Sequence, residues 1–357
     1  MHILDRRWRP QTDSANRSTM NMKKEYILMK KLISLILSVI LIASLFTGCS
    51  GSNAGTSASE SGSYNVAIVQ QLDHSSLDEI REAVKAQLNA LAAEKNLTIH
   101  IEEFNGQNDA TVLNQIGAQV VSDGYDIIIP IATLAAQCMV TAADGTDIPI
   151  VYAAISDPAA AGLTDLSNVT GTSDALNTAF ILDMMFAAQP DIQTVGLLYS
   201  NSEANSATPI AEAKAYLDAK GIAYLEKTGN STDEIVTAAS SVVDRVDAVF
   251  TPTDNVVMAA EGAVAEILNA AGIPHYTGAD SFVTAGAFTT CGVNYTELGT
   301  YTANMAMDAL QGGVIPEYHV MDGGIITVNT ETAAALNLDY GVFSEIANTV
   351  VEVTTGE

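Results

Sequence analysis

Short runs of β-branched and aliphatic residues alternate with amphipathic segments through most of this 357-residue chain. From Leu77 to Leu91 the large apolar residues stand three and four positions apart, which is typical of a helix with one apolar face. Strands that alternate with helices form βαβ units, so the pattern predicts an α/β fold with parallel sheets. The predicted strands are Val66–Val69, Thr98–Phe104, Asp126–Ile131, Ile148–Ala153, Val195–Tyr199, Ala223–Glu226, Ala248–Thr251 and Pro274–Thr277.

The strand pattern occurs twice in the same order. Val66-Ala-Ile-Val is echoed by Val195-Gly-Leu-Leu, and Ile148-Pro-Ile-Val by Ile273-Pro-His-Tyr. A repeat of this length predicts two lobes of the same topology, and we expect the chain to cross between them near residues 171–174, 280 and 312–318. The expected boundaries are residues 64–172 plus about 281–312 for lobe 1, residues 173–280 plus about 313–345 for lobe 2, and residues 346–357 for a C-terminal tail.

Residues 29–49 combine two lysines, an apolar run from Leu32 to Phe46, and the small residues Thr47 and Gly48 before Cys49. This arrangement is typical of a bacterial lipoprotein signal. We therefore expect residues 1–28 to be a non-native N-terminal extension, residues 29–48 a signal peptide, and residues 49–63 a flexible tether lipidated at Cys49. A retained transmembrane anchor is the alternative.

The chain is acidic, with 42 Asp and Glu against 15 Lys and Arg and a formal net charge of −27. Nucleic acid and anionic lipid are bound by clustered cations, so this balance argues against both as partners. Membrane attachment would come from the lipid on Cys49. For Cys138 and Cys291, a disulfide and two separately buried thiols both stay open.

Polar side chains follow the predicted strands at their carboxyl ends, where an open parallel sheet binds its ligand. Two lobes facing each other would enclose a cleft there. The expected ligand-binding residues are Gln71, Thr133, Ser156, Asp157, Asn205, Ser206, Thr253, Asp254, Asn255 and Asp280. This set suits a small polar ligand whose ammonium group pairs with a buried Asp, while hydroxyls, amides and backbone N–H groups hold a carboxylate. Taken singly, residues such as Thr133 and Asp254 are explained as well by helix capping.

Seven short blocks stand in sequence between residues 64 and 340: His74-Ser-Ser-Leu77-Asp78, Ala132-Thr133-Leu-Ala-Ala-Gln137, Ser156-Asp157-Pro158, Asn168-Val-Thr-Gly171, Glu203-Ala-Asn205-Ser206, Pro252-Thr253-Asp254-Asn255 and Tyr295-Thr-Glu-Leu-Gly299. In this order they resemble the blocks of ABC-transporter substrate-binding lipoproteins associated with aromatic amino acids. The resemblance implies a type I periplasmic-binding fold, with two Rossmann-like lobes, three hinge crossings and a ligand trapped by closure.

The resemblance also implies partners and a site. A membrane permease and an ATPase on separate chains are expected, with the protein a monomer, lipid-anchored on the extracytoplasmic face and without a cofactor. The site residues that fall on matched blocks are Thr133, Asp157, Asn205, Ser206, Asp254, Asn255 and Asp280. For an aromatic side-chain pocket, Tyr152, Tyr199, Phe282 and Tyr295 are candidates, and core or hinge packing explains them equally well.

Other functional classes find less support. We see no convergent catalytic set, no phosphate-binding loop and no metal-ligand spacing among the histidines, so we expect neither an enzyme nor a metalloprotein. A regulator of the same fold would carry a helix-turn-helix where this chain has a signal and a tether. A ligand-sensing subunit for a membrane receptor stays open, as does a sugar or nucleoside ligand, although a mature chain without Trp8 lacks the indole on which sugars commonly stack.

Overall fold

Two largely parallel sheets organise residues 62–356, the part of the chain that the computed structural model describes. The predicted α/β class with two sheets is confirmed. The expected N-terminal extension, the signal peptide, Cys49 and nearly all of the tether lie outside the described residues. The tether was expected to reach residue 63, but the first strand already begins at Ser63.

Lobe 1 is built on a six-stranded sheet of the described chain, in the order β11-β5-β4-β3-β1-β2. Every pair in it is parallel. Its elements are β1 Ser63–Gln70, α2 Ser75–Lys95, β2 Thr98–Asn105, α3 Ala110–Asp123, β3 Ile127–Ile131, α4 Thr133–Ala142, β4 Ile150–Tyr152, β5 Val169–Ser173, α11 Tyr295–Leu310 and β11 His319–Val320.

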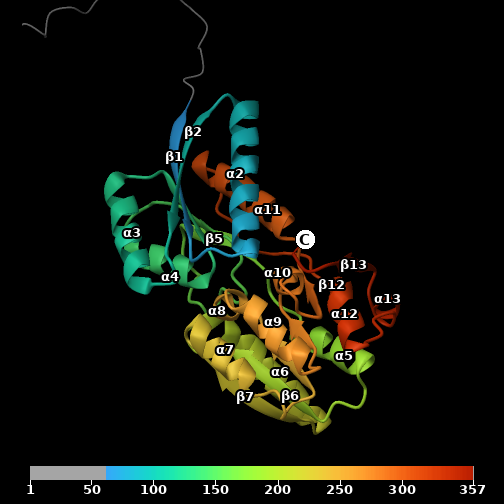
Figure 1. Ribbon diagram of the computed structural model, residues 1–357. Coiled ribbons are helices and arrows are strands. Elements are labelled where there is room, and N and C mark those ends of the chain that lie inside the picture. Colours follow the sequence, from blue (N-terminus) through green and yellow to red (C-terminus); the bar gives the residue numbers. More distant parts are fainter. Residues whose placement is uncertain (1–61, 357) are drawn as a thin grey trace, which may run out of the picture. The chain divides into compact units, whose positions relative to one another are not determined.

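Helices cover both faces of this sheet (Figure 1). Successive residues of a strand point to opposite faces, so β1 is apolar on both. Val66 and Ile68 pack in the core that contains the buried face of α2, whereas Ala67 and Val69 pack in a separate core with α3 and α4. Burial on both sides explains why the strand reads as a continuous apolar run rather than an alternating one.

α11 comes from far along the chain and packs along α2 (Figure 1). Gly299 makes this approach possible, because a Cβ at that position would lie 2.7 Å from Ala83 Cβ and 2.7 Å from the Ile80 carbonyl oxygen. The last residue of the Tyr295–Gly299 block is therefore a packing requirement of lobe 1.

Lobe 2 is built on a seven-stranded sheet of the described chain, in the order β13-β12-β10-β9-β8-β6-β7, with one antiparallel pair between β10 and β12. Its elements are α5 Thr178–Ala188, β6 Thr194–Tyr199, the 3₁₀ turn η1 Ala204–Ser206, α6 Ala207–Lys220, β7 Ala223–Thr228, α7 Thr232–Ser240, β8 Ala248–Thr251, α8 Asn255–Met258, α9 Glu261–Ala270, β9 His275–Thr277, α10 Asp280–Thr284, β10 Thr289–Gly292, β12 Ile325–Asn329, α12 Thr330–Leu336, α13 Phe343–Ile346 and β13 Thr349–Val353.

Three of the expected lobe boundaries are wrong. Residues 281–292 belong to lobe 2, because β10 pairs with β9 and β12, so the second crossing follows Gly292 rather than Asp280. β11 pairs with β5, which keeps residues 319–320 in lobe 1. Within the expected tail, β13 extends the second sheet beside β12. β10 is Thr-Thr-Cys-Gly, β11 is only His-Val, and Glu352 interrupts the valines of β13, so the hydrophobic pattern did not reveal these strands.

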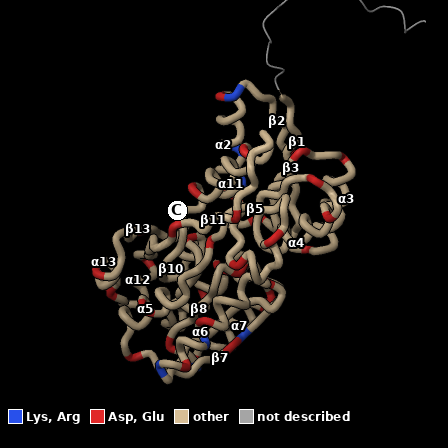
Figure 2. Tube along the Cα trace, turned by 180° about the vertical axis from the view of Figure 1, so that it is seen from behind, with Lys and Arg blue, Asp and Glu red and all other residues tan. Residues whose placement is uncertain are grey.

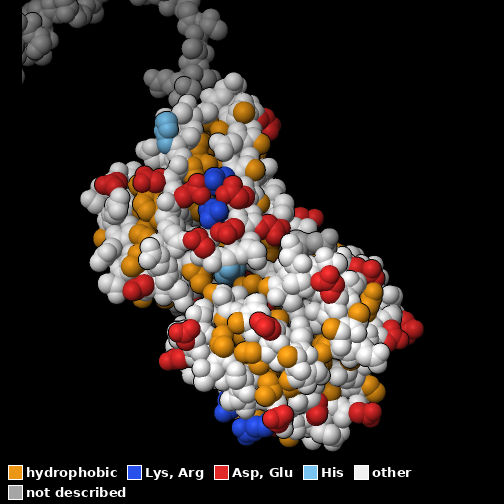
Figure 3. All heavy atoms as spheres, in the orientation of Figure 1, with side chains coloured by type: hydrophobic (Ala, Val, Ile, Leu, Met, Phe, Trp, Pro, Cys, Tyr) orange, Lys and Arg blue, Asp and Glu red, His pale blue; other side chains and the backbone are white. Residues whose placement is uncertain are grey.

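Charge on the described chain is mostly negative, and its acidic residues are spread over both lobes (Figure 2). The strongest basic group, Arg81 and Lys85 on α2, is paired with Asp78, Glu82 and Glu103 at 2.8–3.2 Å. Figure 3 shows this basic group ringed by acidic side chains. No helix among residues 62–356 is long and apolar enough to cross a membrane.

Candidate ligand-binding site

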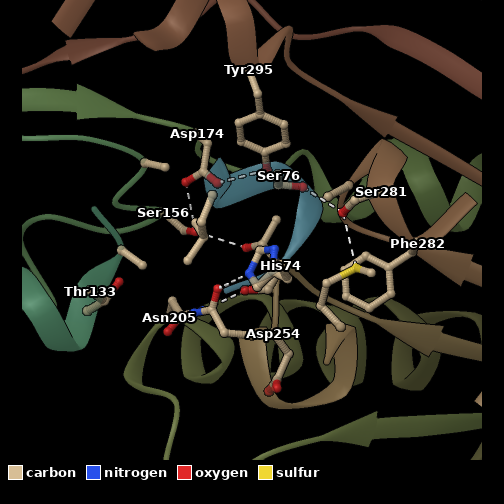
Figure 4. Close-up of a pocket in the computed structure, with 17 residues that line it drawn as sticks. His74, Ser76, Thr133, Ser156, Asp174, Asn205, Asp254, Ser281, Phe282 and Tyr295 are labelled. Carbon is tan, nitrogen blue, oxygen red and sulfur yellow. Dashed lines mark hydrogen bonds between the residues drawn. The ribbon is translucent and has the colours of Figure 1, made fainter. Parts of the chain in front are cut away.

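A cavity of about 30 Å³ lies where the strand ends of the two lobes meet (Figure 4). Lobe 1 contributes the start of α2, the start of α4 and the loop after β4, and lobe 2 contributes η1, α8 and α10. Six expected site residues line the cavity: Thr133, Ser156, Asn205, Thr253, Asp254 and Asn255. The other lining residues are His74, Ser76, Leu77, Ala132, Ala154, Asp174, Met258, Ala279, Ser281, Phe282 and Tyr295.

Asp254 lies on this wall, but its carboxylate accepts hydrogen bonds from groups of lobe 2. One oxygen accepts the N–H groups of Val256 and Val257 at 3.1 and 3.0 Å, which caps α8. The other oxygen accepts the Ser200 N–H at 2.7 Å and the Ser206 hydroxyl at 2.6 Å. A carboxylate accepts about four hydrogen bonds, so this one is fully engaged. Ser206 holds Asp254 and does not line the cavity, so here the capping interpretation holds.

Gln71, also expected in the site, lies between the lobes rather than on the cavity wall. Its side-chain amide donates to Glu203 Oε1 at 2.7 Å and to Asn108 Oδ1 at 2.9 Å. Its side-chain oxygen, Oε1, accepts the Leu134 N–H at 3.0 Å. The residue is fully buried, so these bonds replace its hydration.

Glu203 is a buried carboxylate that the sequence-based site set omitted. Its second oxygen accepts the Asn255 side-chain amide at 2.6 Å, and Asn255 Oδ1 contacts His74 Nε2 at 3.0 Å. Burial, together with the neighbouring charge of Asp254, raises the pKa of Glu203 to about 7. Burial lowers the pKa of His74, which favours a neutral imidazole.

Asp157 and Asp280 were expected to contact ligand, and the structure places both off the cavity wall. Asp157 accepts the Ala160 N–H at 2.9 Å and the Thr208 hydroxyl of lobe 2 at 2.8 Å, beside a separate hollow. Asp280 is the first residue of α10, between the lining residues Ala279 and Ser281. Burial, with a contribution from the charge of Glu79, raises the pKa of Asp280 to about 6.

Asp174 is the acidic residue on the wall that the sequence prediction missed. It directly follows β5 and is 6% exposed. It accepts hydrogen bonds from the Ser156 hydroxyl at 2.9 Å and the Tyr295 hydroxyl at 3.2 Å. Burial raises its pKa, and these two bonds oppose the shift. The expected lobe crossing near residues 171–174 could have pointed to Asp174 as a site residue. The sequence analysis did not recognise β5, the strand before it.

The larger apolar side chains on the wall are those of Leu77, Met258 and Phe282. Of the four aromatic candidates, Phe282 and Tyr295 line the cavity. Tyr152 packs its ring against Gly171 in lobe 1, and the Tyr199 hydroxyl donates to Glu226 at 2.9 Å, so neither lies on the wall. Among the described residues, no Lys or Arg lines the cavity and no group of three His, Cys, Asp or Glu could hold a metal ion.

Hydrogen bonds between the lobes surround the cavity. In addition to the Gln71–Glu203 and His74–Asn255 contacts, Ser156 Oγ lies 2.9 Å from Thr253 Oγ1, and the Ser76 hydroxyl donates to Ser281 Oγ at 2.6 Å. A water molecule needs about 10–15 Å³ of such space, so the cavity has room for about two. Any larger ligand must enter with the lobes apart.

Two similar lobes, three crossings and a polar cavity between them define a hinged binding protein. The chain belongs to the family of ABC transporter substrate-binding proteins, whose family model matches residues 65–346.

Similar proteins fit this assignment. A tyrosine-binding protein of Clostridioides difficile is 31% identical over 322 residues, which cover 87% of this chain and 93% of the relative. The solved ABC domain in complex with L-Trp from Streptococcus pneumonia is 29% identical with a TM-score of 0.75, covering 81% of this chain and 100% of that one. A ligand-free, open substrate-binding protein with adhesive properties from Clostridium difficile is 30% identical with a TM-score of 0.62, covering 82% and 99%.

Proposed function

We propose that this protein captures an aromatic L-amino acid between its lobes and delivers it to an ABC importer. The observation that carries the proposal is the mixed chemistry of the cavity wall. Hydroxyls, amides and the Asp174 carboxylate line it together with the apolar side chains of Leu77, Met258 and Phe282. A ligand with a small polar head and a large apolar side chain matches both kinds of group. The tyrosine-binding relative and the L-Trp complex support the same class of ligand.

Capture by hinge closure is the proposed mechanism. The lobe-to-lobe hydrogen bonds around the cavity must separate to admit a ligand, which then makes its own contacts to both lobes. The TM-score is 0.75 to the L-Trp complex and 0.62 to the ligand-free, open protein, at nearly equal sequence identity. This difference supports an arrangement of the lobes closer to the ligand-bound form.

Delivery needs partners outside this chain. A membrane permease and an ATPase on separate chains follow from the family, and the lipid on Cys49 would hold the protein at the extracytoplasmic face of the membrane. The Arg81–Lys85 cluster is neutralised by its acidic neighbours, so attachment through the lipid agrees better with the charge than electrostatic adsorption does.

A ligand screen tests the proposal. Both sheets and their cores lie within residues 62–356, so a protein starting at residue 62 is a suitable sample. We expect L-tyrosine, L-tryptophan or L-phenylalanine to raise its melting temperature, because a ligand at 100 times its Kd adds about 2.7 kcal/mol to stability. Sugars, nucleosides and short aliphatic amino acids serve as controls. A response to a sugar or nucleoside with none to the aromatic amino acids would contradict the proposal.

A further inference from the structure

We propose that Asp174 holds the ammonium group of the bound amino acid, with the side-chain oxygen of Asn205 as a second acceptor. This inference rests on the proposed function and assigns the orientation of the ligand within the same site. The sequence analysis expected a buried Asp in this role and named Asp157, Asp254 and Asp280 among the site residues, but not Asp174.

Asp254 and Asp174 differ in the number of hydrogen bonds that their carboxylates can still accept. Four donors from lobe 2 occupy the two oxygens of Asp254. The oxygens of Asp174 receive one side-chain hydrogen bond each, from the Ser156 and Tyr295 hydroxyls. A hydroxyl rotates to suit its surroundings and also accepts hydrogen bonds, so both can remain beside an ammonium group. Asp174 therefore has room for a charged donor, and Asp254 has none.

The Asp174 carboxylate has no cationic side chain beside it on the cavity wall that residues 62–356 form. Asp174 is 6% exposed, and no Lys or Arg lines the cavity among the described residues. An ionised carboxylate in such a place is costly until a cation arrives. An ammonium group would supply that cation with three N–H donors. Figure 4 shows Asp174 beside Ser156 and Tyr295, whereas the Asp254 carboxylate lies on the far side of His74 and turns away from it.

Asn205, on the same wall, carries an acceptor without a partner among the described residues. Asn205 is 6% exposed, and its side-chain NH₂ group donates to the Thr253 carbonyl at 2.6 Å. Its Oδ1 is buried and has no hydrogen-bond partner among the described residues. The bond to Thr253 fixes the orientation of the Asn205 amide. If the amide were flipped, Asn205 Oδ1 would face the Thr253 carbonyl oxygen, and neither atom can donate. A buried orphan acceptor is unfavourable unless a ligand donor meets it, and an ammonium group is such a donor.

The same wall offers a counterpart for the ligand carboxylate. The N-cap residues of α2 and α4, His74 and Ala132, make no side-chain capping hydrogen bond, and in α4 the Gln71 side chain accepts only the Leu134 N–H of the first turn. Both residues line the cavity, as do Ser76 and Thr133 in the first turns that follow. Helix N-termini attract anions through their free N–H groups. The ammonium and carboxylate groups would therefore meet different parts of the wall, which fixes the direction in which the ligand lies.

The experiment compares each binding amino acid with its des-amino analogue. Calorimetry on the protein from residue 62 measures L-tyrosine against 3-(4-hydroxyphenyl)propionate, or L-tryptophan against indole-3-propionate. We expect the wild type to prefer the amino acid, and Asp174→Asn to lower amino acid affinity about 30-fold or more while changing analogue affinity less than about 3-fold. Asn205→Ala should reduce the same preference by a smaller factor.

Asp254→Asn and Asp280→Asn are the matched controls. Each removes one carboxylate charge, as Asp174→Asn does, at a nearby position. Both should keep the preference for the amino acid, although Asp254→Asn should also lower the melting temperature. If Asp174→Asn keeps the full preference, or if Asp280→Asn removes it, the assignment is wrong. If no aromatic amino acid binds the wild type, the proposed function fails instead, so the two failures are distinct.

Discussion

The side-chain amide of Gln71 in lobe 1 donates to the carboxylate of Glu203 in lobe 2 across 2.7 Å, and both residues are buried. Glu203 also accepts from Asn255, whose Oδ1 contacts His74 of lobe 1. The four residues thus form one hydrogen-bonded path that leaves lobe 1 and returns to it. Such a path exists only when the lobes are close, so it contributes to the closed arrangement.

Removing Gln71 should weaken ligand capture without unfolding the protein. Gln71→Ala leaves Glu203 Oε1 and the Leu134 N–H without their partner, which costs about 1–3 kcal/mol in the closed arrangement. Calorimetry should show ligand affinity reduced by a corresponding factor, with a smaller effect on the melting temperature. Gln87→Ala is the control, because Gln87 bonds Asn304 on the exposed side of α2, away from the cavity. Equal affinity in the two variants would contradict this role.

Ligand binding should depend on pH through Glu203. In the closed arrangement burial and the charge of Asp254 raise the pKa of Glu203 to about 7, from an ordinary value of 4.5. A group with a raised pKa binds its proton more tightly in that state, so closure takes up a proton between these two pH values. Below about 4.5 the carboxyl is protonated in both arrangements, and above about 7 in neither. Affinity should therefore fall as pH rises through this window and level off above it.

Proton uptake is measured directly by calorimetry at pH 6 in buffers of different ionisation enthalpy. The nearby titratable groups are Asp254, His74, Asp174 and Asp280, so the contribution of Glu203 is the difference between the wild type and Glu203→Gln. We expect this variant to bind more weakly, since its NH₂ group faces another amide donor, and to take up less proton. Equal uptake by the two proteins would show that Glu203 is not the responsible group.

The same shift predicts a change in the free energy of unfolding. Glu203 has a higher pKa in the folded protein than in the unfolded chain, so its contribution to stability is fully present below about pH 4.5 and is lost as pH rises to about 7. The amount is on the order of 3 kcal/mol. Urea denaturation at pH 5 and pH 8 should show a smaller difference for Glu203→Gln than for the wild type. An unchanged difference would contradict this account.

The two body cysteines should be unreactive thiols in the native protein. Cys138 lies in a core of lobe 1 and Cys291 in a core of lobe 2, and both are free and buried. Burial raises the pKa of Cys291 to about 11, which removes the reactive thiolate at neutral pH. A thiol reagent should modify the protein from residue 62 only after denaturation, and a reducing agent should not alter its melting temperature. Rapid modification of the native protein would contradict this.

The sequence predicted the fold well where burial decided the pattern. Val66–Val69 and Asp126–Ile131 are apolar runs whose Val and Ile side chains are buried on both faces of the sheet, and they mark β1 and β3. β10 and β13 lie toward one end of the second sheet. β10 is Thr-Thr-Cys-Gly and Glu352 interrupts the valines of β13, so only their pairing identifies them. The errors in the lobe boundaries follow from these strands.

The candidate site was predicted at the level of strand ends but not of individual atoms. Of the residues expected from their type and position, Asn205, Asp254 and Asn255 line the cavity. Residue types alone give no side-chain geometry. They could not show that four donors already occupy Asp254 while Asn205 Oδ1 has no partner among the described residues. That difference depends on side-chain directions, which arise from packing of elements distant in sequence.

Two helical glycines should respond in opposite ways to alanine. Alanine has a helix propensity better than glycine by about 1 kcal/mol, and a methyl group added at Gly262 on α9 would meet no described atom within 4 Å. Gly262→Ala should therefore stabilise the protein by about 0.5–1 kcal/mol. At Gly299 the same methyl group would lie 2.7 Å from Ala83 Cβ and the Ile80 carbonyl oxygen, so α11 must shift from α2. Gly299→Ala should destabilise by about 1–3 kcal/mol despite its better propensity. Urea denaturation measures both, and a stabilising Gly299→Ala would show that the α2–α11 contact adapts without cost.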